Sequence, residues 1–513
     1  MTDERRPVHR RTMLKGAAAA AAGLATLGDG AADPNPGPIA GAPPERAVGR
    51  GDGFLAGVGV RAVSPLPSHL EDGVHLGGYG VYTSERGPAT GVHDEIDARA
   101  LAFRSGTETV ALVVVDVPGI GNRLVRDIKT RVAERTGLDE PAILVEATHT
   151  HAGPDLQGLW GGVPESYREF LVERTARAVV DAVSDLGEAD LLVGTSEAGD
   201  RIYNRRGWDE LHTTVNVMQV RRDDETVATL VNYSSHAVIV SSDNRLVSTD
   251  FVGPLQREVE DRFGGTTVFS PGTIGDVNPE YPDEGEFEGA RVYGESLLPA
   301  VGRAVDDAEP VDSGLERRSA TVRFPLDNCL FRTAFEVGLL KPYYSAESVS
   351  GRAAAAVGAG ETAPDAGALA VHSPVTRLRL GSGADRVEFV TVPGEATSRI
   401  AAVIRPVMGG RAQFTLGLTN NTLGYIVPTD EWGSGRHGAY EETVSTGPNA
   451  APNYVETVQA LYDDPRESPW RRKDRFGRIC PGGQANLRGN VGIGAPELAV
   501  RLANRDAEPT DAF

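Results

Sequence analysis

Two histidines, His149 and His151, stand two positions apart just after an apolar β-type run at 142–145. In a strand, residues i and i+2 face the same side, so both imidazoles can converge on one point. Imidazole nitrogen is a common ligand of zinc. The pair therefore predicts a metal centre, although histidines at this spacing can also bond only to local backbone.

A catalytic zinc site needs about three protein ligands and an open position, and three further segments offer candidates. His236 follows a β-type run at 226–233, Glu395 lies where a strand turns into a helix, and Tyr425 follows a polar loop at 418–424. Each has a simpler interpretation. His236 alone can be structural, Glu395 can cap the following helix, and Tyr425 can belong to the core.

The order and composition of these segments resemble the neutral/alkaline, non-lysosomal ceramidase family, in its catalytic N-terminal domain only. The strongest match is Ala-Thr-His-Thr-His-Ala-Gly-Pro at 147–154. The further matches are Asn-Arg at 204–205, Asn-Tyr-x-x-His at 232–236, Ser-Thr-Asp at 248–250, Gly-Asp-Val-Asn-Pro at 275–279, Pro-Gly-Glu-x-Thr at 393–397 and Gly-Tyr at 424–425. The resemblance extends from residue 57 to about residue 447.

The resemblance implies a site and a reaction. One zinc ion per chain would be held by four side chains: His149, His236, Glu395 and Tyr425. Three more would act on the amide: His151 and Tyr440 as donors to the oxyanion or leaving group, and Arg205 in positioning the carbonyl. The implied reaction is hydrolysis of an N-acyl amide bond, in a ceramide-like lipid or another N-acyl substrate, by a zinc-activated water. A neutral His151 could pass a proton to the leaving amine.

The chain departs from the family pattern in three ways. Asn278 stands where the family has a serine, which excludes a serine nucleophile there but leaves zinc chemistry possible. The immunoglobulin-like C-terminal domain of longer members is expected to be missing, so access to membrane lipid is expected to differ. The spacing between Glu395 and Tyr425 is shorter than in the relatives, which sets Tyr425 apart from the other three ligands.

Two other classes of function stay open. One is a metal hydrolase of another class, amidohydrolase-like or phosphatase-like. In such enzymes too, a His-x-His motif after a strand supplies the first ligands of the metal site. The eightfold β/α alternation of an amidohydrolase barrel is missing from the second half. The other is a non-catalytic secreted binding protein with a relict metal site.

The elements around the motifs predict an α/β fold in which mixed β-sheets are flanked by helices, an αββα-type layered sandwich. In the first part, strands are expected at 109–115, 142–145, 191–194, 213–220, 226–233 and 266–269, and helices at 123–136, 164–184, 252–263 and 289–308. The second half is β-rich and partly antiparallel, with strands at 316–324, 375–380, 387–392 and 412–418 and a helix at 397–407.

The N-terminus predicts export. The pair Arg10 and Arg11, followed by an Ala-rich apolar run, predicts a twin-arginine signal peptide over 1–32. A spanning helix needs about 20 apolar residues, more than this run contains. The remaining chain is expected to form a disordered linker at 33–53, the catalytic domain at 54–503 and a disordered tail at 504–513. An Ala/Gly-rich stretch at 351–370 is expected to be a flexible insertion or lid.

The composition is acidic, with 72 Asp+Glu against 51 Lys+Arg and a net charge of -21. No basic stripe is visible, which disfavours nucleic-acid binding. Scarce lysine and many carboxylates favour a halophilic prokaryote, although a GC-rich genome would also favour arginine. The signal peptide places the expected location outside the cell or at its surface. Only Cys329 and Cys480 could pair. A small-molecule or lipid substrate is expected. The sequence leaves three further points open: peripheral contact with a membrane surface, a structural Mg²⁺ or Ca²⁺ ion, and the oligomeric state.

Overall fold

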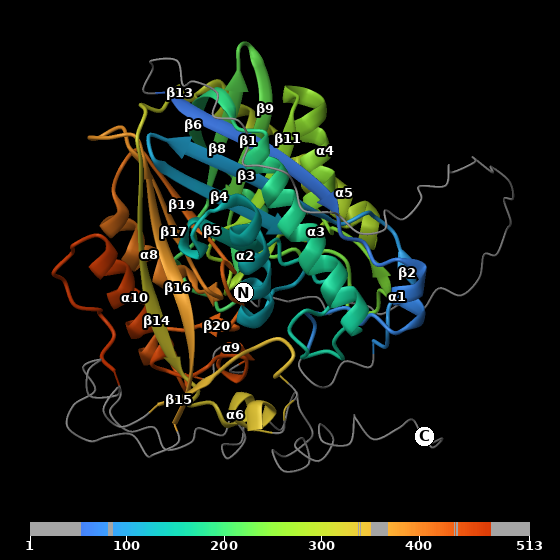
Figure 1. The fold of residues 1–513 in the computed structure, drawn as a ribbon. Coiled ribbons are helices and arrows are strands. Elements are labelled where there is room, and N and C mark those ends of the chain that lie inside the picture. Colours follow the sequence, from blue (N-terminus) through green and yellow to red (C-terminus); the bar gives the residue numbers. More distant parts are fainter. Residues whose placement is uncertain are drawn as a thin grey trace, which may run out of the picture. The chain divides into compact units, whose positions relative to one another are not determined.

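A nine-stranded sheet with the order β11-β9-β8-β6-β1-β3-β4-β5, and β13 paired to β6, forms the first layer (Figure 1). Its strands are β1 (Phe54–Ala62), β3 (Asp97–Ser105), β4 (Glu108–Val115), β5 (Ile143–Ala147), β6 (Gly187–Glu197), β8 (Thr214–Arg222), β9 (Glu225–Tyr233), β11 (Thr266–Pro271) and β13 (Glu309–Pro310). The outer pairs β4·β5 and β9·β11 are parallel, and the other pairs are antiparallel. Parallel neighbours need a crossover, which α2 (Asn122–Thr136) and α4 (Val252–Phe263) provide.

The second sheet has the order β14-β16-β17-β19, with β15 paired to β16. Its strands are β14 (Leu315–Pro325), β15 (Glu347–Val349), β16 (Ala368–Leu380), β17 (Val387–Thr391) and β19 (Ala412–Leu416). The parallel pair β17·β19 is joined through α8 (Ser398–Met408), and the remaining pairs are antiparallel.

The two sheets pack face to face, and helices cover both outer faces. Leu112 and Leu144 of the first sheet share one buried core with Phe389 and Phe414 of the second. Helices α2, α3 (Glu165–Ser184), α4 and α5 (Glu286–Asp306) lie on the first sheet, while α8 and α10 (Ala450–Leu461) lie on the second, as Figure 1 shows. The predicted αββα-type layered sandwich is therefore confirmed.

The remaining described elements are short. They are α1 (Pro67–Glu71), β2 (Gly91–Val92), β7 (Ile202–Asn204), β10 (Leu246–Val247), β12 (Val277–Pro279), β18 (Glu395–Ala396), β20 (Tyr425–Ile426), α6 (Cys329–Glu336), α9 (Tyr440–Thr443) and the 3-10 turns at Glu140–Ala142, Gly199–Arg201 and Thr429–Glu431. Three pairs of them form two-stranded sheets: β2·β10, β7·β12 and β18·β20.

The computed structural model describes residues 53–80, 86–336, 338, 340–349, 368–434, 437 and 440–472. These residues do not include the predicted signal peptide, nearly all of the predicted linker, the predicted tail or Cys480. The backbone of Cys329 is described, but its side chain is not. The predicted insertion at 351–370 needs a correction at its end, because β16 begins at Ala368. None of the helices described is long and apolar enough to cross a membrane.

Strand β1 was not predicted, because Gly57 and Gly59 interrupt its apolar pattern. A Cβ atom at either glycine would overlap the backbone of α3, at Ala182 and Ala178. The two glycines therefore allow the helix to approach the strand closely.

Candidate metal centre

His149 follows β5 and has left-handed backbone geometry, with φ of 66°. Such a conformation is uncommon for a residue other than glycine. Its N–H donates to the carbonyl of Val117 at 3.1 Å, and its Nδ1 lies 2.5 Å from the carbonyl of Pro118. Because a carbonyl can only accept, Nδ1 carries the ring proton and Nε2 presents a lone pair.

His236, which follows β9, has the same tautomer for the same reason. Its Nδ1 lies 2.9 Å from the carbonyl of Val277, so Nε2 is again the free acceptor. The ring is fully buried, and burial lowers its pKa to about 4, with Arg205 also lowering it and Glu395 opposing the shift. His236 is therefore neutral at pH 7.

Glu395 brings these two rings together through one oxygen. Its Oε2 lies 3.2 Å from Nε2 of His236 and 3.4 Å from Nε2 of His149. Burial opposes ionisation of Glu395, whereas a proton on either neighbouring ring would hold the pKa of this carboxyl well below its usual value. Three acceptors thus face one another, an arrangement that is stable when a cation or proton lies between them.

The spacing of these atoms fits a zinc ion. Ligands at about 2.0–2.1 Å from a tetrahedral zinc lie about 3.3 Å apart, and the two measured contacts to Glu395 agree with this value. Backbone carbonyls behind each imidazole are the usual outer support of metal-bound histidine. The alternative that Glu395 only caps α8 is not supported, because Asp276 accepts from the backbone N–H of Ser398 at the start of that helix.

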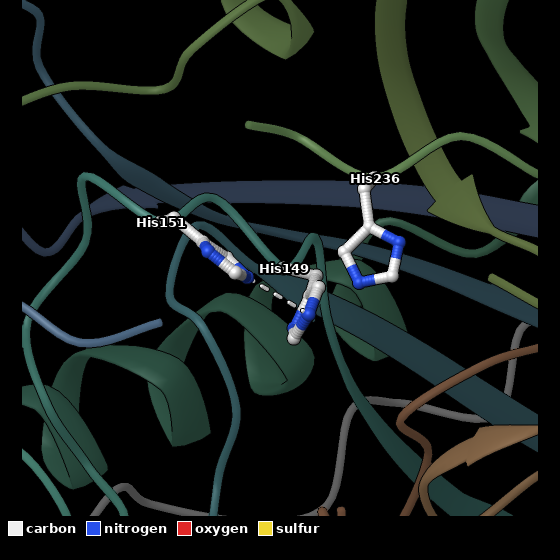
Figure 2. A group of neighbouring side chains, drawn as sticks. All are labelled: His149, His151 and His236. Carbon is white, nitrogen blue, oxygen red and sulfur yellow. Dashed lines mark hydrogen bonds between the residues drawn. The ribbon is translucent and has the colours of Figure 1, made fainter. Parts of the chain in front are cut away.

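His151 lies beside this group but is held differently. The ligand atoms of all three histidines are within 4.8 Å of one another, and Figure 2 shows the rings converging. His151 Nε2 lies 3.0 Å from His149 Nε2, while its Nδ1 is buried with no partner among the described residues. Burial first, and the two other histidines next, hold the pKa of His151 well below its usual value. Neither ring nitrogen of His151 has a hydrogen bond to a backbone group among the described residues.

Tyr425 is brought to Glu395 by β18 and β20, where the two residues pair. Its ring stacks under the Arg205 guanidinium at 5.2 Å and lies 5.8 Å from the ring of Tyr440. Burial raises the pKa of Tyr425 well above its usual value, and Arg205 acts in the opposite direction. Tyr440 shows the same effect, and its pKa is raised to about 12.

Arg205 and Asn278 form the neighbouring wall. Arg205 donates to Asn278 Oδ1 at 3.1 Å, to the Gly275 carbonyl at 2.8 Å and to Glu441 Oε1 at 3.0 Å. Every residue predicted for the site is therefore described near the others: His149, His151, Arg205, His236, Asn278, Glu395, Tyr425 and Tyr440.

Several residues of this site were not predicted. Glu441 is fully buried and accepts from Arg206 at 2.6 Å as well as from Arg205. Tyr79 places its ring 4.7 Å from that of His151, and its hydroxyl donates to the Val240 carbonyl at 2.5 Å. The Gly-Gly pair at 77–78 was the available signal, because a Cβ at Gly78 would overlap the His151 ring.

The fold and the site together define a layered α/β protein with a buried three-histidine group able to hold a metal ion. In sequence, the chain is 23% identical to the neutral ceramidase of Mycobacterium tuberculosis over 277 residues, covering 44% of this chain and 43% of that protein. The match thus spans less than half of that relative. No protein-family profile matches the chain.

Solved structures extend the likeness to most of the chain. A neutral ceramidase from Pseudomonas aeruginosa superposes with a TM-score of 0.61 at 18% identity, covering 80% of this chain and 74% of that one. A ceramidase complexed with C2 gives a TM-score of 0.62 at 18% identity, covering 82% and 77%. The fold is that of the neutral ceramidases, and the resemblance predicted from the motifs is confirmed.

Proposed function

We propose that this chain is a zinc-dependent amidohydrolase that cleaves the amide bond of an N-acyl substrate, as the ceramidase likeness suggests. One observation carries the proposal: Glu395 Oε2 faces the unprotonated Nε2 atoms of His149 and His236 at 3.4 and 3.2 Å. Three buried acceptors repel one another unless a cation is shared between them. Their chemistry, nitrogen with one carboxylate oxygen, suits zinc.

In this proposal, His149, His236 and Glu395 hold the ion and Tyr425 completes the set. Bound zinc supplies Lewis acidity, which polarises an amide carbonyl and lowers the pKa of a water to about 7. Arg205 stabilises the phenolate form of Tyr425, because its positive charge lies over that ring.

His151 is assigned to proton transfer. It is neutral at pH 7, it adjoins the proposed ligands, and its Nδ1 has no partner in the described part of the chain. An uncommitted neutral imidazole can accept a proton from water and return it to the leaving amine. Tyr440, beside Tyr425, is assigned to donate a hydrogen bond to the oxyanion.

The test combines metal analysis with a substrate panel. Purified wild type should contain one zinc per chain, and His236→Ala should lose it. Hydrolysis is followed on N-acyl-sphingosine, N-acyl amino acids and simple amides at high salt. Zinc without hydrolysis of any of these would favour a binding protein with a relict site, and protein without any transition metal would exclude the proposal. Phosphatase activity that depends on the same zinc ion would instead favour a phosphatase-like metal hydrolase.

We propose further that the chain is exported through the paired arginines Arg10 and Arg11. The pair stands before an Ala-rich apolar run, as in twin-arginine signals. Replacing both by lysine in a host with this pathway should keep the protein in the cytoplasm. Unchanged export of that variant would contradict the proposal.

A further inference from the structure

Strands β5 and β11 stand at the two ends of the strand order of the first sheet, so no backbone ladder joins them. Their side chains nevertheless meet. Ser270 of β11 donates to Glu146 Oε1 of β5 at 2.7 Å, and both residues are fully buried. Within the described residues, this is the one hydrogen bond between the two strands. The sheet therefore curves until its end strands touch, and Glu146 and Ser270 join them.

This contact lies close in sequence to two of the proposed metal ligands. His149 comes three residues after Glu146, on the segment that leaves β5. Ser270 pairs in the parallel ladder with Asn232 of β9, and His236 comes four residues after Asn232. The two histidines thus come from the two end regions of one sheet. How closely their rings approach depends on how these ends are held together.

Asn232 and Asn420 extend the contact to the second sheet. Asn232 Nδ2 lies 3.0 Å from the Ser270 carbonyl and 2.9 Å from the carbonyl of Thr415 on β19. Asn420 follows β19 and bonds β5 at one residue. Its N–H donates to the Val145 carbonyl at 2.7 Å, and its Oδ1 accepts from the Val145 N–H at 3.3 Å. Strands β5, β9 and β11 are therefore all joined to the β19 segment.

Glu146 is an unfavourable residue at this position for stability alone. Its Oε2 is buried and has no hydrogen-bond partner among the described residues. Burial raises the pKa of this carboxyl well above its usual value, and the bond from Ser270 opposes the shift without cancelling it. A buried polar atom without a partner destabilises the folded state, whereas apolar side chains in place of both partners can be neutral or stabilising. What the pair contributes is the fixed geometry of its hydrogen bond.

We propose that Glu146 and Ser270 are positioning residues of the metal centre, whose hydrogen bond fixes the approach of His149 to His236. The rings of these two histidines lie 4.8 Å apart, measured between centroids. The inference rests on the proposed zinc-dependent function. Neither Glu146 nor Ser270 has a hydrogen bond to a proposed ligand in the described structure. Their replacement should therefore change the affinity and geometry of the ion without removing a ligand.

The test measures zinc affinity and the visible absorption of the Co²⁺-substituted protein, which reports the coordination geometry of the ion. Glu146→Leu combined with Ser270→Ala removes both partners at nearly constant volume. We expect this double variant to bind zinc about 10-fold or more weakly, the scale for outer partners of a metal site, and to shift the Co²⁺ absorption. Its urea midpoint should stay at or above that of wild type. Glu146→Gln keeps the acceptor oxygen and should retain wild-type affinity and absorption.

Two single variants keep the test decisive. Ser270→Ala deletes the hydrogen bond by itself and should change affinity and absorption in the same direction, even if the double variant does not fold. Ser196→Ala is the matched control, because Ser196 Oγ donates at 2.7 Å to the Ala300 carbonyl and joins β6 of the same sheet to α5. It should leave both measurements unchanged. Wild-type values in Ser270→Ala and in the double variant would overturn the proposal, as would an equal change in Ser196→Ala.

Hydrogen exchange of the metal-free protein separates this proposal from the one on which it rests. Amides of residues 144–151 should exchange faster in the double variant than in wild type, because β5 is then no longer joined to β11. If wild type binds no transition metal, the zinc proposal fails, and unchanged exchange at 144–151 would overturn the positioning role as well. If wild type binds zinc and the double variant binds it equally well, the positioning role alone fails.

Discussion

Glu395 and Tyr425 lie opposite each other on the paired strands β18 and β20. The Glu395 N–H donates to the Gly424 carbonyl at 2.9 Å, and this bond fixes the register of the pair. A Cβ at Gly424, where φ is 72°, would overlap the carbonyl of Val444, so only glycine suits the turn before Tyr425. The shorter spacing between the two residues therefore does not keep Tyr425 away from Glu395.

Tyr425→Phe should weaken zinc binding without disturbing the core. The ring remains, so packing against Arg205 and Tyr440 is preserved, while the oxygen is lost. Loss of outer partners of a metal site costs about 10–100-fold in affinity, and loss of a direct ligand should cost at least as much. Competition with a zinc chelator measures the change.

Tyr440→Phe provides the comparison for that experiment. Tyr440 lies against Tyr425 and is assigned to the oxyanion, so its loss should reduce kcat by about 10-fold or more while zinc affinity stays at the wild-type value. Equal zinc affinity in Tyr425→Phe and wild type would remove Tyr425 from the ligand set.

His149 and His151 should respond differently to replacement by alanine. His149 has its Nδ1 fixed on Pro118 and its Nε2 facing Glu395, whereas His151 has no backbone partner for either ring nitrogen. We expect His149→Ala to lose zinc and His151→Ala to retain it while kcat falls by about 10²–10⁴-fold, the range of general acid–base catalysis. Zinc per chain is measured on dialysed protein. Equal loss of zinc in both variants would instead make His151 a third histidine ligand.

Gly78→Ala should disturb His151 without touching any proposed ligand. Gly78 has φ of 105°, and a Cβ there would overlap the His151 ring, which must move. Gly73→Ala is the matched control, since its φ of 93° imposes the same backbone strain while no atom lies within 4 Å of the new methyl group. Activity should fall much more in Gly78→Ala, with zinc content unchanged in both. The same loss in both variants would mean that backbone strain alone is responsible.

Local patterns were sufficient for much of this fold and site. Strand-like runs located β5 and β9, and His149 and His236 follow these strands within three residues. Both the α/β first part and the β-rich second part follow from the same periodicity. Here hydrophobic pattern and tertiary packing agree.

Contacts between distant loops could not be predicted in this way. Glu441 is enclosed by Arg205 and Arg206 because the segment after β7 and the short helix α9 fold against each other, and no sequence periodicity predicts such a contact. Tyr79 meets His151 only because Gly78 allows its segment to approach. Contacts of this kind depend on the complete tertiary fold rather than on local secondary-structure preference.

Lys129 offers a test of stability that is independent of the site. It lies on α2, is 5% exposed, and burial lowers its pKa to about 7, with Glu140 opposing and Arg317 adding to the shift. Below pH 7 the lysine is charged in both the folded and the unfolded chain, so the folded state bears the full cost of burying the charge. Between about pH 7 and pH 10 the unfolded chain binds more protons, and stability rises with pH.

Lys129→Met should therefore be more stable than wild type, and most clearly at low pH. One pKa unit corresponds to about 1.4 kcal/mol, so wild type should gain up to about 3 kcal/mol between pH 7 and pH 9 from this group. Urea midpoints of both proteins at pH 6.5 and pH 9 measure the effect. The advantage of Lys129→Met should shrink at pH 9, while Lys341→Met, at an exposed position, should change neither midpoint. An advantage that is independent of pH would show that Lys129 keeps its ordinary pKa in the folded protein.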